Sequence, residues 1–275
     1  MENKIGVGII TCNRPDFLAK LLESISYRND VELVIVNDGG PIDIKGYNYY
    51  IINNETNLGV GKSKNKAMQH LLDKGCDYIF IIEDDMIILD ETVFEKYIQA
   101  SKASGIQHFN YGPGSPFNRK QVIQNFDLHN RHLLDQHTEP NPRLVVDYGN
   151  DIKVSLFEHT VAMFSFFTRE VLEKVGLYDE AYYNAWEHVD HTYMIIKAGY
   201  HPPFWYFADI FDSHKYLTGA PGAIDNSSIA NKSEQWEKNV YGGREIYKQK
   251  HGHYPNQPPH STKETVLETL KKLKP

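Results

Sequence analysis

Strand-like and helix-like segments alternate over the first hundred residues of this 275-residue chain. Continuous apolar runs at 5–11, 31–36 and 77–82 have the composition of buried strands, and apolar side chains recur with helical spacing at 17–25 and 60–72. Strands that alternate with helices build a mostly parallel sheet whose two faces are covered by the helices. The sequence therefore predicts an α/β fold organised around such a sheet.

Polar side chains follow three of the predicted strands at the points where these strands end. The first strand leads into residues 11–14, the next into residues 37–38, and the most apolar one into residues 83–85. In open α/β sheets, ligands bind in the crevice beyond the carboxyl ends of the strands. One crevice would therefore collect all three polar groups, which indicates a nucleotide site.

The three consecutive carboxylates of residues 83–85 are suited to hold a divalent cation. When a transfer reaction releases a nucleoside diphosphate, the charge that develops on the leaving group needs a cation to stabilise it. Asp85 or Glu83 could ligate such an ion while it bridges the two phosphates. The alternative is that acids after a buried strand only cap the next helix or face water.

Four stretches resemble, in their order and spacing, the motifs of the GT-A glycosyltransferases, especially those of the family-2-like group. They are residues 9–15, 36–39, 82–85 and 176–180, the last of which leads to residues 186–190. The segment from Asn57 and Gly59 to Asn65 is similar to a further Asn/Gly/Asn stretch of that group. The resemblance covers most of residues 4–215. It implies a GT-A type, mostly parallel sheet with helices on both faces and a C-terminal helical extension.

The resemblance also implies a donor site and a metal site. The residues expected to bind the nucleotide-sugar donor are Thr11, Asn13, Arg14, Asn37, Asp38, Asn65, Glu83 and Asp84, and those expected to bind the metal are Asp85 and His214. One imidazole beside carboxylates favours Mn²⁺, with Mg²⁺ as the alternative. UDP is the expected nucleotide because it is the commonest in the resembled group.

The sequence departs from the family pattern at two of these positions. Asn37 stands where the family often has an acid, and Glu83 stands where the acid triplet usually begins with Asp. Neither departure removes the carboxylate of Asp85.

Residues 186–190 are the expected source of the general base. In an inverting transfer, this base takes the proton of the acceptor hydroxyl while the oxygen attacks the anomeric carbon. In many relatives the base is an Asp directly after the Glu of this motif, and His188 occupies that position here. Histidine can act as a base near neutral pH, while Glu187 and Asp190 are rival candidates. Trp186 could stack on the acceptor sugar or belong to the core.

A purely structural interpretation of the same segment is a charged helix start, in which acidic side chains complement the helix dipole. Lys62 and Lys64 also allow a functional and a structural interpretation. They lie close to two glycines and could touch phosphate, or they could be solvated on a helix surface. The glycines fit no known phosphate-binding fingerprint, so both lysines are expected to be solvated on a helix surface.

The resemblance divides the chain into three parts. Residues 1–105 are expected to form the nucleotide-sugar-binding half, and residues 106–215 the acceptor-binding and catalytic half of the same domain. Residues 216–275 are expected to form a flexible loop and C-terminal helices. Small polar residues and glycines at 216–233 favour a loop that closes over the bound donor, and residues 200–208 are expected to be a strand.

Composition limits the partners. A net charge of −7 and a pI near 6.0 argue against nucleic acid. The resemblance implies a nucleotide-sugar donor and a glycan or glycoconjugate acceptor as partners. No segment approaches the ~20 apolar residues of a membrane span, and the N-terminal residues do not resemble a signal peptide. The expected location is therefore cytoplasmic. Lys271, Lys272 and Lys274 could make a peripheral membrane contact, although last-turn lysines are also the ordinary complement of a helix dipole.

Two other functions compete with glycosyl transfer. A sugar nucleotidyltransferase would be expected to carry a glycine-rich basic run in its first loop, and residues 11–15 have none. A degenerate, non-catalytic sugar-binding module is favoured only by His188 at the usual base position. Glu187, Asp190, Asp85 and His214 argue instead that the catalytic apparatus persists.

Overall fold

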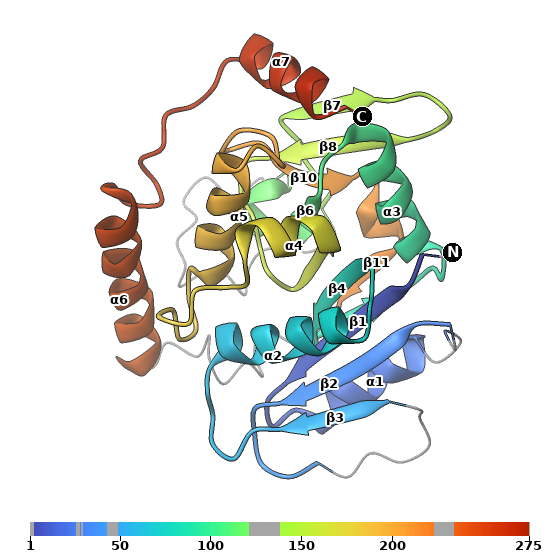
Figure 1. Cartoon of the computed structure of the whole chain (residues 1–275), viewed down its shortest axis with the longest axis vertical. Coiled ribbons are helices and arrows are strands. Elements are labelled where there is room, and N and C mark those ends of the chain that lie inside the picture. The colour runs from blue at the N-terminus through green and yellow to red at the C-terminus, as the bar shows by residue number, and fades with distance from the viewer. Residues whose placement is uncertain are drawn as a thin grey trace.

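The computed structural model describes residues 3–25, 28, 30–42, 49–120, 138–222 and 234–274. The named strands and helices of these residues are, in chain order, β1 (Ile5–Thr11), α1 (Pro15–Ile25), β2 (Glu32–Asn37), β3 (Tyr50–Asn53), α2 (Val60–Asp73), β4 (Tyr78–Glu83), β5 (Met86–Ile88), α3 (Val93–Ser104), β6 (His108–Asn110), β7 (Leu144–Asp147), β8 (Lys153–Phe157), β9 (Phe164–Thr168), α4 (Arg169–Val175), α5 (Glu187–Lys197), β10 (Phe207–Ile210), β11 (Leu217–Gly219), α6 (Glu234–His251) and α7 (Lys263–Leu273) (Figure 1).

The central sheet contains six strands in the order β3-β2-β1-β4-β9-β6. Strands β1 to β4 run parallel, whereas β9 runs antiparallel to both of its neighbours. One face of the sheet packs against α1, α3 and α7, and the other packs against α2, α4 and α5. Figure 1 shows α2 and α4 in front of the sheet and α1 behind it. The predicted α/β class, with a mostly parallel sheet covered on both faces, is confirmed.

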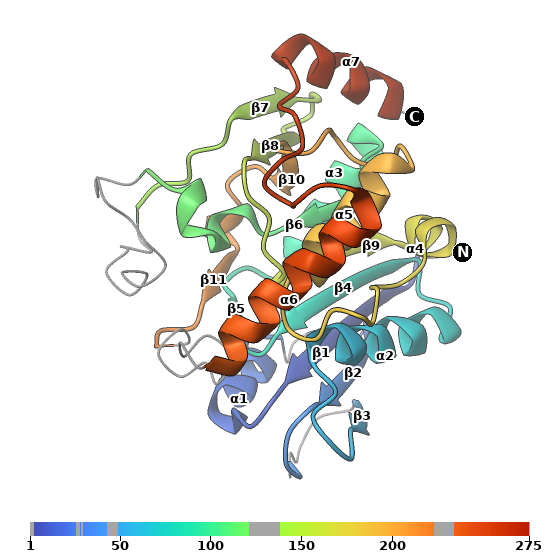
Figure 2. The same cartoon turned by 90° about the vertical axis from the view of Figure 1, so that its left-hand side faces the viewer.

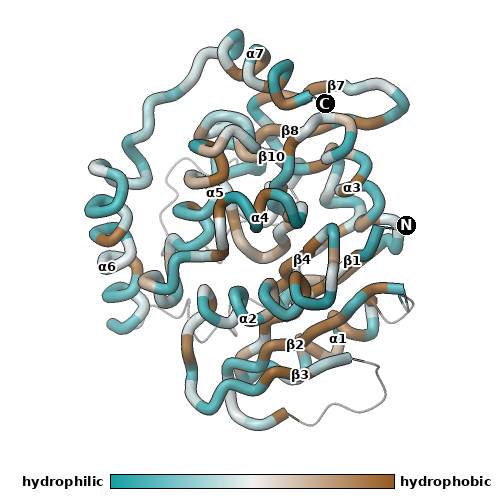
Figure 3. Tube along the Cα trace, viewed as in Figure 1, coloured by the Kyte–Doolittle hydropathy of each residue, from teal (hydrophilic) through white to brown (hydrophobic). Residues whose placement is uncertain are grey.

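Burial of the central strands explains why their sequences lack the polar alternation of a surface sheet. All seven residues of β1 and the last four of β2 are buried, because helices cover both faces. Figure 3 shows these strands among the most hydrophobic parts of the trace, whereas α6 is mostly hydrophilic. The polar residues at the carboxyl ends of β1, β2 and β4 therefore follow directly from buried, apolar strands.

Two smaller sheets correct the strand predictions. Strand β10 pairs with β8, and its first residue is Phe207. The strand expected at 200–208 is thus mostly wrong, because Pro202 and Pro203 have no N–H group to donate to a ladder. The prediction of a loop at 216–233 is wrong at its start, because residues 217–219 form β11, which pairs antiparallel with β5. Residues 223–233 lie outside the described part of the chain.

The C-terminal helices pack on the domain. Val266 and Leu270 of α7 are buried in the same core as α1 and α3, so the apolar face of this amphipathic helix is already covered by protein. Figure 2 shows α6 running along the side of the molecule beside α5. Among the described residues, no helix has the length and apolar character of a membrane span.

Candidate active site

The three polar groups predicted at strand ends do meet at one edge of the sheet. The backbone N–H of Asp38 donates to the Thr11 carbonyl at 2.8 Å, and the N–H of Asp84 donates to the Ile10 carbonyl at 3.1 Å. The Thr11 hydroxyl donates to Asp84 Oδ2 at 2.7 Å. The parallel register of β1 with β2 and β4 therefore brings residues 11–14, 37–38 and 83–85 together at one edge of the sheet.

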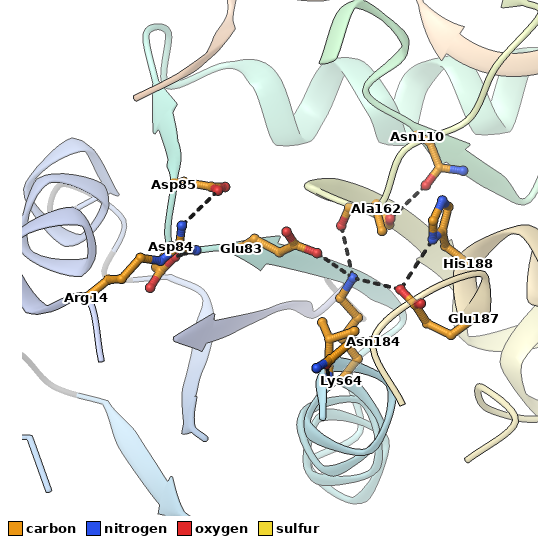
Figure 4. A network of polar contacts seen from close by, with 12 residues as sticks. Arg14, Lys64, Glu83, Asp84, Asp85, Asn110, Ala162, Asn184, Glu187 and His188 are labelled. Carbon is orange, nitrogen blue, oxygen red and sulfur yellow. Dashed lines mark hydrogen bonds and ion pairs between the residues drawn. The ribbon is translucent and has the colours of Figure 1, made fainter. Parts of the chain in front are cut away.

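The side chain of Arg14 contacts the acid triplet of residues 83–85 directly. Its guanidinium pairs with both Asp84 and Asp85, the latter at 3.2 Å (Figure 4). Burial raises the pKa of Asp84 to about 7 despite the pairing with Arg14. The pKa of Asp85 is also raised, first by burial and then by the charge of Glu83. Burial thus disfavours the charged forms of Asp84 and Asp85, and a bound cation would stabilise those forms.

Asp85 has the free coordination capacity that a metal ligand needs. Its Oδ1 is buried and has no hydrogen-bond partner within the described structure, although buried carboxylate oxygens normally find one. Glu83 and Asp84 are engaged by Lys64 and by Thr11 with Arg14. Asp85 is therefore the residue of the triplet best placed to ligate an added cation.

His214 lies toward the other end of the β5–β11 ladder from Asp85, and its role as a second ligand of the same ion stays a prediction. Strand β11 is antiparallel to β5, which puts Gly219 opposite Met86, and Ala220 N–H donates to the Asp85 carbonyl at 2.7 Å. His214 precedes β11 and lies at the opposite end of this ladder. There it lines a separate pocket with Phe157 and Phe211. No cluster of three or more metal-ligating side chains occurs among the described residues.

The Asp38 carboxylate holds the loop that precedes α2. Its Oδ1 accepts from Asn54 Nδ2 at 2.7 Å and from Leu58 N–H at 2.8 Å, and its Oδ2 accepts from Gly59 N–H at 2.9 Å. The neighbouring Asn37 donates its amide to Asn53 and to the Gly40 carbonyl. Both predicted donor residues therefore shape the strand-end turn.

Asn13 joins the first two polar groups. It adopts a left-handed conformation with φ of 55°, and its Oδ1 accepts from Gly40 N–H at 2.7 Å. Asn65, in contrast, contacts the segment that precedes α5. Its amide makes hydrogen bonds with both backbone groups of Tyr178 and with Glu180. Asn65 thus positions the chain that leads to α5.

Lys64 corrects the expectation of a solvated lysine, because its side chain is fully buried. Its Nζ lies 2.7 Å from Glu83 Oε1 and 3.7 Å from Glu187 Oε1, and it donates to the Ala162 carbonyl at 3.2 Å (Figure 4). Burial lowers the pKa of Lys64, but the two carboxylates outweigh it and the pKa is raised. Lys64 is thus a buried cation that connects the acid triplet with the start of α5.

The three rival bases lie in different surroundings. Asp190 is buried and paired with His251 Nε2 at 2.6 Å and with Lys250 Nζ at 2.8 Å. Glu187 is also buried, and its Oε1 lies 3.3 Å from His188 Nδ1. Burial raises the pKa of Glu187, but His188 and Lys64 lower it further, to about 2. His188 has the most accessible side chain of the three, at 22%.

Trp186 is held by α6. Its backbone is left-handed, with φ of 71°, at the residue before α5. Its indole N–H donates to the Val240 carbonyl at 2.9 Å, and its ring packs in a cluster with Tyr182 and Tyr247. The hydrogen-bonded edge of the indole is therefore occupied by protein, and contact with an acceptor sugar stays a prediction.

Two adjacent glycines of α6 allow the packing of Trp186 against this helix to be tested. A Cβ added at Gly243 would lie 2.8 Å from Trp186 Cδ1 and 2.9 Å from the Ala185 carbonyl, whereas a Cβ at Gly242 would meet nothing within 4 Å. We expect Gly243→Ala to lower the free energy of unfolding by about 1–2 kcal/mol, because overpacking exceeds the gain in helix propensity. Gly242→Ala should be neutral or stabilising by up to ~1 kcal/mol. Urea denaturation measures the free energy of unfolding of both variants. Equal changes in the two variants would contradict the close packing of Gly243 against Trp186.

Comparison with known proteins identifies the family. A family model described as glycosyl transferase family 2 matches residues 6–176, which is more than half of the chain. An uncharacterized glycosyltransferase of Acanthamoeba polyphaga mimivirus is 26% identical over 242 residues, which cover 82% of this chain and 85% of that protein.

A solved structure supports the fold. The structure of TarS from S. aureus matches with a TM-score of 0.51 at 13% sequence identity, and the match covers 98% of this chain and 48% of TarS. The chain therefore spans about half the length of TarS. At this identity the likeness concerns the fold, and it agrees with the predicted GT-A type. The family match, the strand-end site and the fold agree, and the chain belongs to glycosyl transferase family 2.

Proposed function

We propose that this chain transfers a sugar from a nucleoside-diphosphate sugar, with UDP favoured, to a hydroxyl group of a glycan or glycoconjugate. The observation that carries the proposal is the carboxylate centre beyond β1 and β4, where Asp85 keeps one buried oxygen without a partner. The family match supports the reaction class. The donor would lie over residues 1–105, and the acceptor would be bound by residues 106–215.

A divalent cation fits this centre, and Asp85 would hold it. When bound, the cation would neutralise charge on the diphosphate as it leaves. A preference for Mn²⁺ depends on an imidazole ligand, and His214, the predicted one, lies toward the other end of the β5–β11 ladder from Asp85. An oxygen ligand set suits Mg²⁺ as well as Mn²⁺, so both ions belong in the tests.

His188 is the proposed base for an inverting transfer. It would take the proton from the acceptor hydroxyl as that oxygen forms a bond to the anomeric carbon and the bond to the diphosphate breaks. Glu187 would orient the imidazole through Nδ1. A pKa of about 2 makes Glu187 itself a weak base, and Asp190 is ion-paired with Lys250 and hydrogen-bonded to His251.

The three-part division of the chain is kept as part of the proposal. Strand β9 belongs to residues 106–215 yet lies in the same sheet as β4, which supports treating the two halves as one domain. Residues 216–275 contribute β11, α6 and α7. Closure of a loop over the donor concerns mainly 223–233, outside the described residues, and stays a prediction.

Replacement of Asp85 tests the proposed donor site. In the wild type, UDP at a hundredfold excess over its Kd should stabilise the fold by about 2.7 kcal/mol, and only with Mn²⁺ or Mg²⁺ present. Asp85→Asn should remove most of this stabilisation because one anionic ligand is lost. Asp73→Asn, an exposed acid at the end of α2, is the matched control.

Thermal unfolding with and without metal provides the measurement, and UDP-sugar turnover separates an enzyme from a degenerate binding module. A metal-independent shift, or a shift that survives in Asp85→Asn, would contradict the assignment of the cation to Asp85. Binding without turnover of any nucleotide sugar would favour the binding module.

A further inference from the structure

Tyr183 is an exposed aromatic residue with strong contacts to the opposite half of the domain. It lies on the segment between α4 and α5, and 41% of its surface is accessible. Its hydroxyl nevertheless donates to Asn57 Oδ1 at 2.5 Å, which belongs to the loop before α2. A side chain from the catalytic half thus reaches the loop that Asp38 organises.

The partners of Asn57 place this contact at the carboxyl ends of β1 and β2. Asn57 Nδ2 donates to the Asp38 carbonyl at 3.1 Å and lies 3.3 Å from Cys12 Sγ. The pKa of Tyr183 is raised by burial and then by the negative charge of Asp38, which agrees with this position. The phenol therefore stands next to the ends of both β1 and β2.

Gly59 permits the close approach of the two segments. It has a φ of 88°, and a Cβ there would collide with the Tyr183 carbonyl and lie 2.8 Å from Tyr183 Cδ2. The next residue, Val60, donates its N–H to Asn184 Oδ1 at 2.9 Å. Backbone and side-chain contacts therefore fix the position of Tyr183, although much of its ring is uncovered.

We propose that Tyr183 forms an aromatic wall at the nucleoside end of the donor site, where its exposed ring stacks on the base. The inference rests on the proposed function, because it requires a nucleoside diphosphate in the crevice. The ring supplies an apolar surface for stacking, and the bond from its hydroxyl to Asn57 holds the ring in place. Stacking accepts every base, because every base has a π-face.

Comparison of nucleoside diphosphates with pyrophosphate tests this wall. Pyrophosphate has the same charged groups but no base, so it reports only the metal and phosphate part of the site. We expect Tyr183→Ala to weaken the best binder among UDP, GDP, ADP and CDP roughly 5- to 150-fold, the range of aromatic stacking on one base. Pyrophosphate affinity in the presence of Mn²⁺ should stay unchanged.

Two further variants serve as controls. Tyr183→Phe keeps the ring and loses the hydroxyl bond to Asn57, so it should retain most of the nucleotide affinity. Tyr241→Ala removes a tyrosine of α6 that is 65% exposed, and it should change neither affinity. Isothermal titration calorimetry on the full chain gives all of the dissociation constants.

The outcomes separate this inference from the proposed function. Equal weakening of nucleotide and pyrophosphate in Tyr183→Ala would overturn the stacking role, as would unchanged affinity for both. Loss in Tyr183→Phe as large as in Tyr183→Ala would show that the hydroxyl, and not the ring, matters. A wild-type chain that binds a nucleoside diphosphate with Mn²⁺, and keeps that affinity in Tyr183→Ala, overturns this inference alone. A wild-type chain that binds no nucleoside diphosphate overturns the proposed function as well.

Discussion

Replacing His188 by alanine is expected to lower kcat by a factor of about 10²–10⁴, the usual contribution of a general base. Donor affinity should stay close to that of the wild type, because His188 contacts Glu187 and not the acid triplet. The pH profile of kcat/KM should lose the limb that reports the base of the free enzyme. Initial rates with a UDP-sugar and a hydroxyl acceptor, measured across pH, provide the test.

The two rival carboxylates provide the matched variants. Glu187→Gln should also slow the reaction, because the carboxylate orients the imidazole, but it should keep a pH-dependent limb. Asp190→Asn should act mainly on stability, since Asp190 pairs with Lys250 and His251. If His188→Ala kept the wild-type rate and either other variant lost the pH-dependent limb, the base would have to be reassigned.

The sheet and the strand-end site could be predicted because both depend on local sequence patterns. Buried parallel strands need continuous apolar runs, and their crossover helices need a periodic apolar stripe. Once the strands are parallel, residues that follow β1, β2 and β4 must meet at one edge. The contact between Thr11 and Asp84 is a direct consequence of this geometry.

Contacts set by long-range packing could not be predicted in the same way. The three-residue strand β11 is too short to show a periodic pattern, yet its antiparallel register determines where His214 lies. The partners of Asp190 are 60 and 61 residues away in sequence. Likewise, nothing local shows that Tyr183 would meet Asn57, 126 residues earlier in the chain.

Lys64 is a different case, because the sequence did contain a signal for its burial. It lies three, four and seven positions before Ala67, Met68 and Leu71, which form the buried stripe of α2. Helical periodicity therefore places its side chain on the core face, while Lys62 falls outside this spacing. A charged residue on an apolar stripe predicts a buried partner of opposite charge, and Glu83 and Glu187 are those partners.

Lys64→Met should consequently be strongly destabilising. Methionine keeps much of the length and volume of the side chain, so the main change is loss of the positive charge between Glu83 and Glu187. Removing one partner of a buried ion pair leaves an uncompensated charge and costs about 3–5 kcal/mol. Lys62→Met on the same helix should stay within about 0.5 kcal/mol of the wild type. Urea unfolding of the three proteins measures the difference.

The pH dependence distinguishes lost charge from lost packing. In the wild type the pKa of Glu187 is about 2, below its value near 4.3 in unfolded chains, so its stabilisation is present above pH ~4.3 and fades as the pH falls to 2. Without Lys64 this pKa rises, and the folded variant binds more protons than the folded wild type. The difference in free energy of unfolding between the wild type and Lys64→Met should therefore grow from pH 4 to pH 7. If this difference were the same at pH 4 and pH 7, the variant would be destabilised by a packing defect and not by the lost charge.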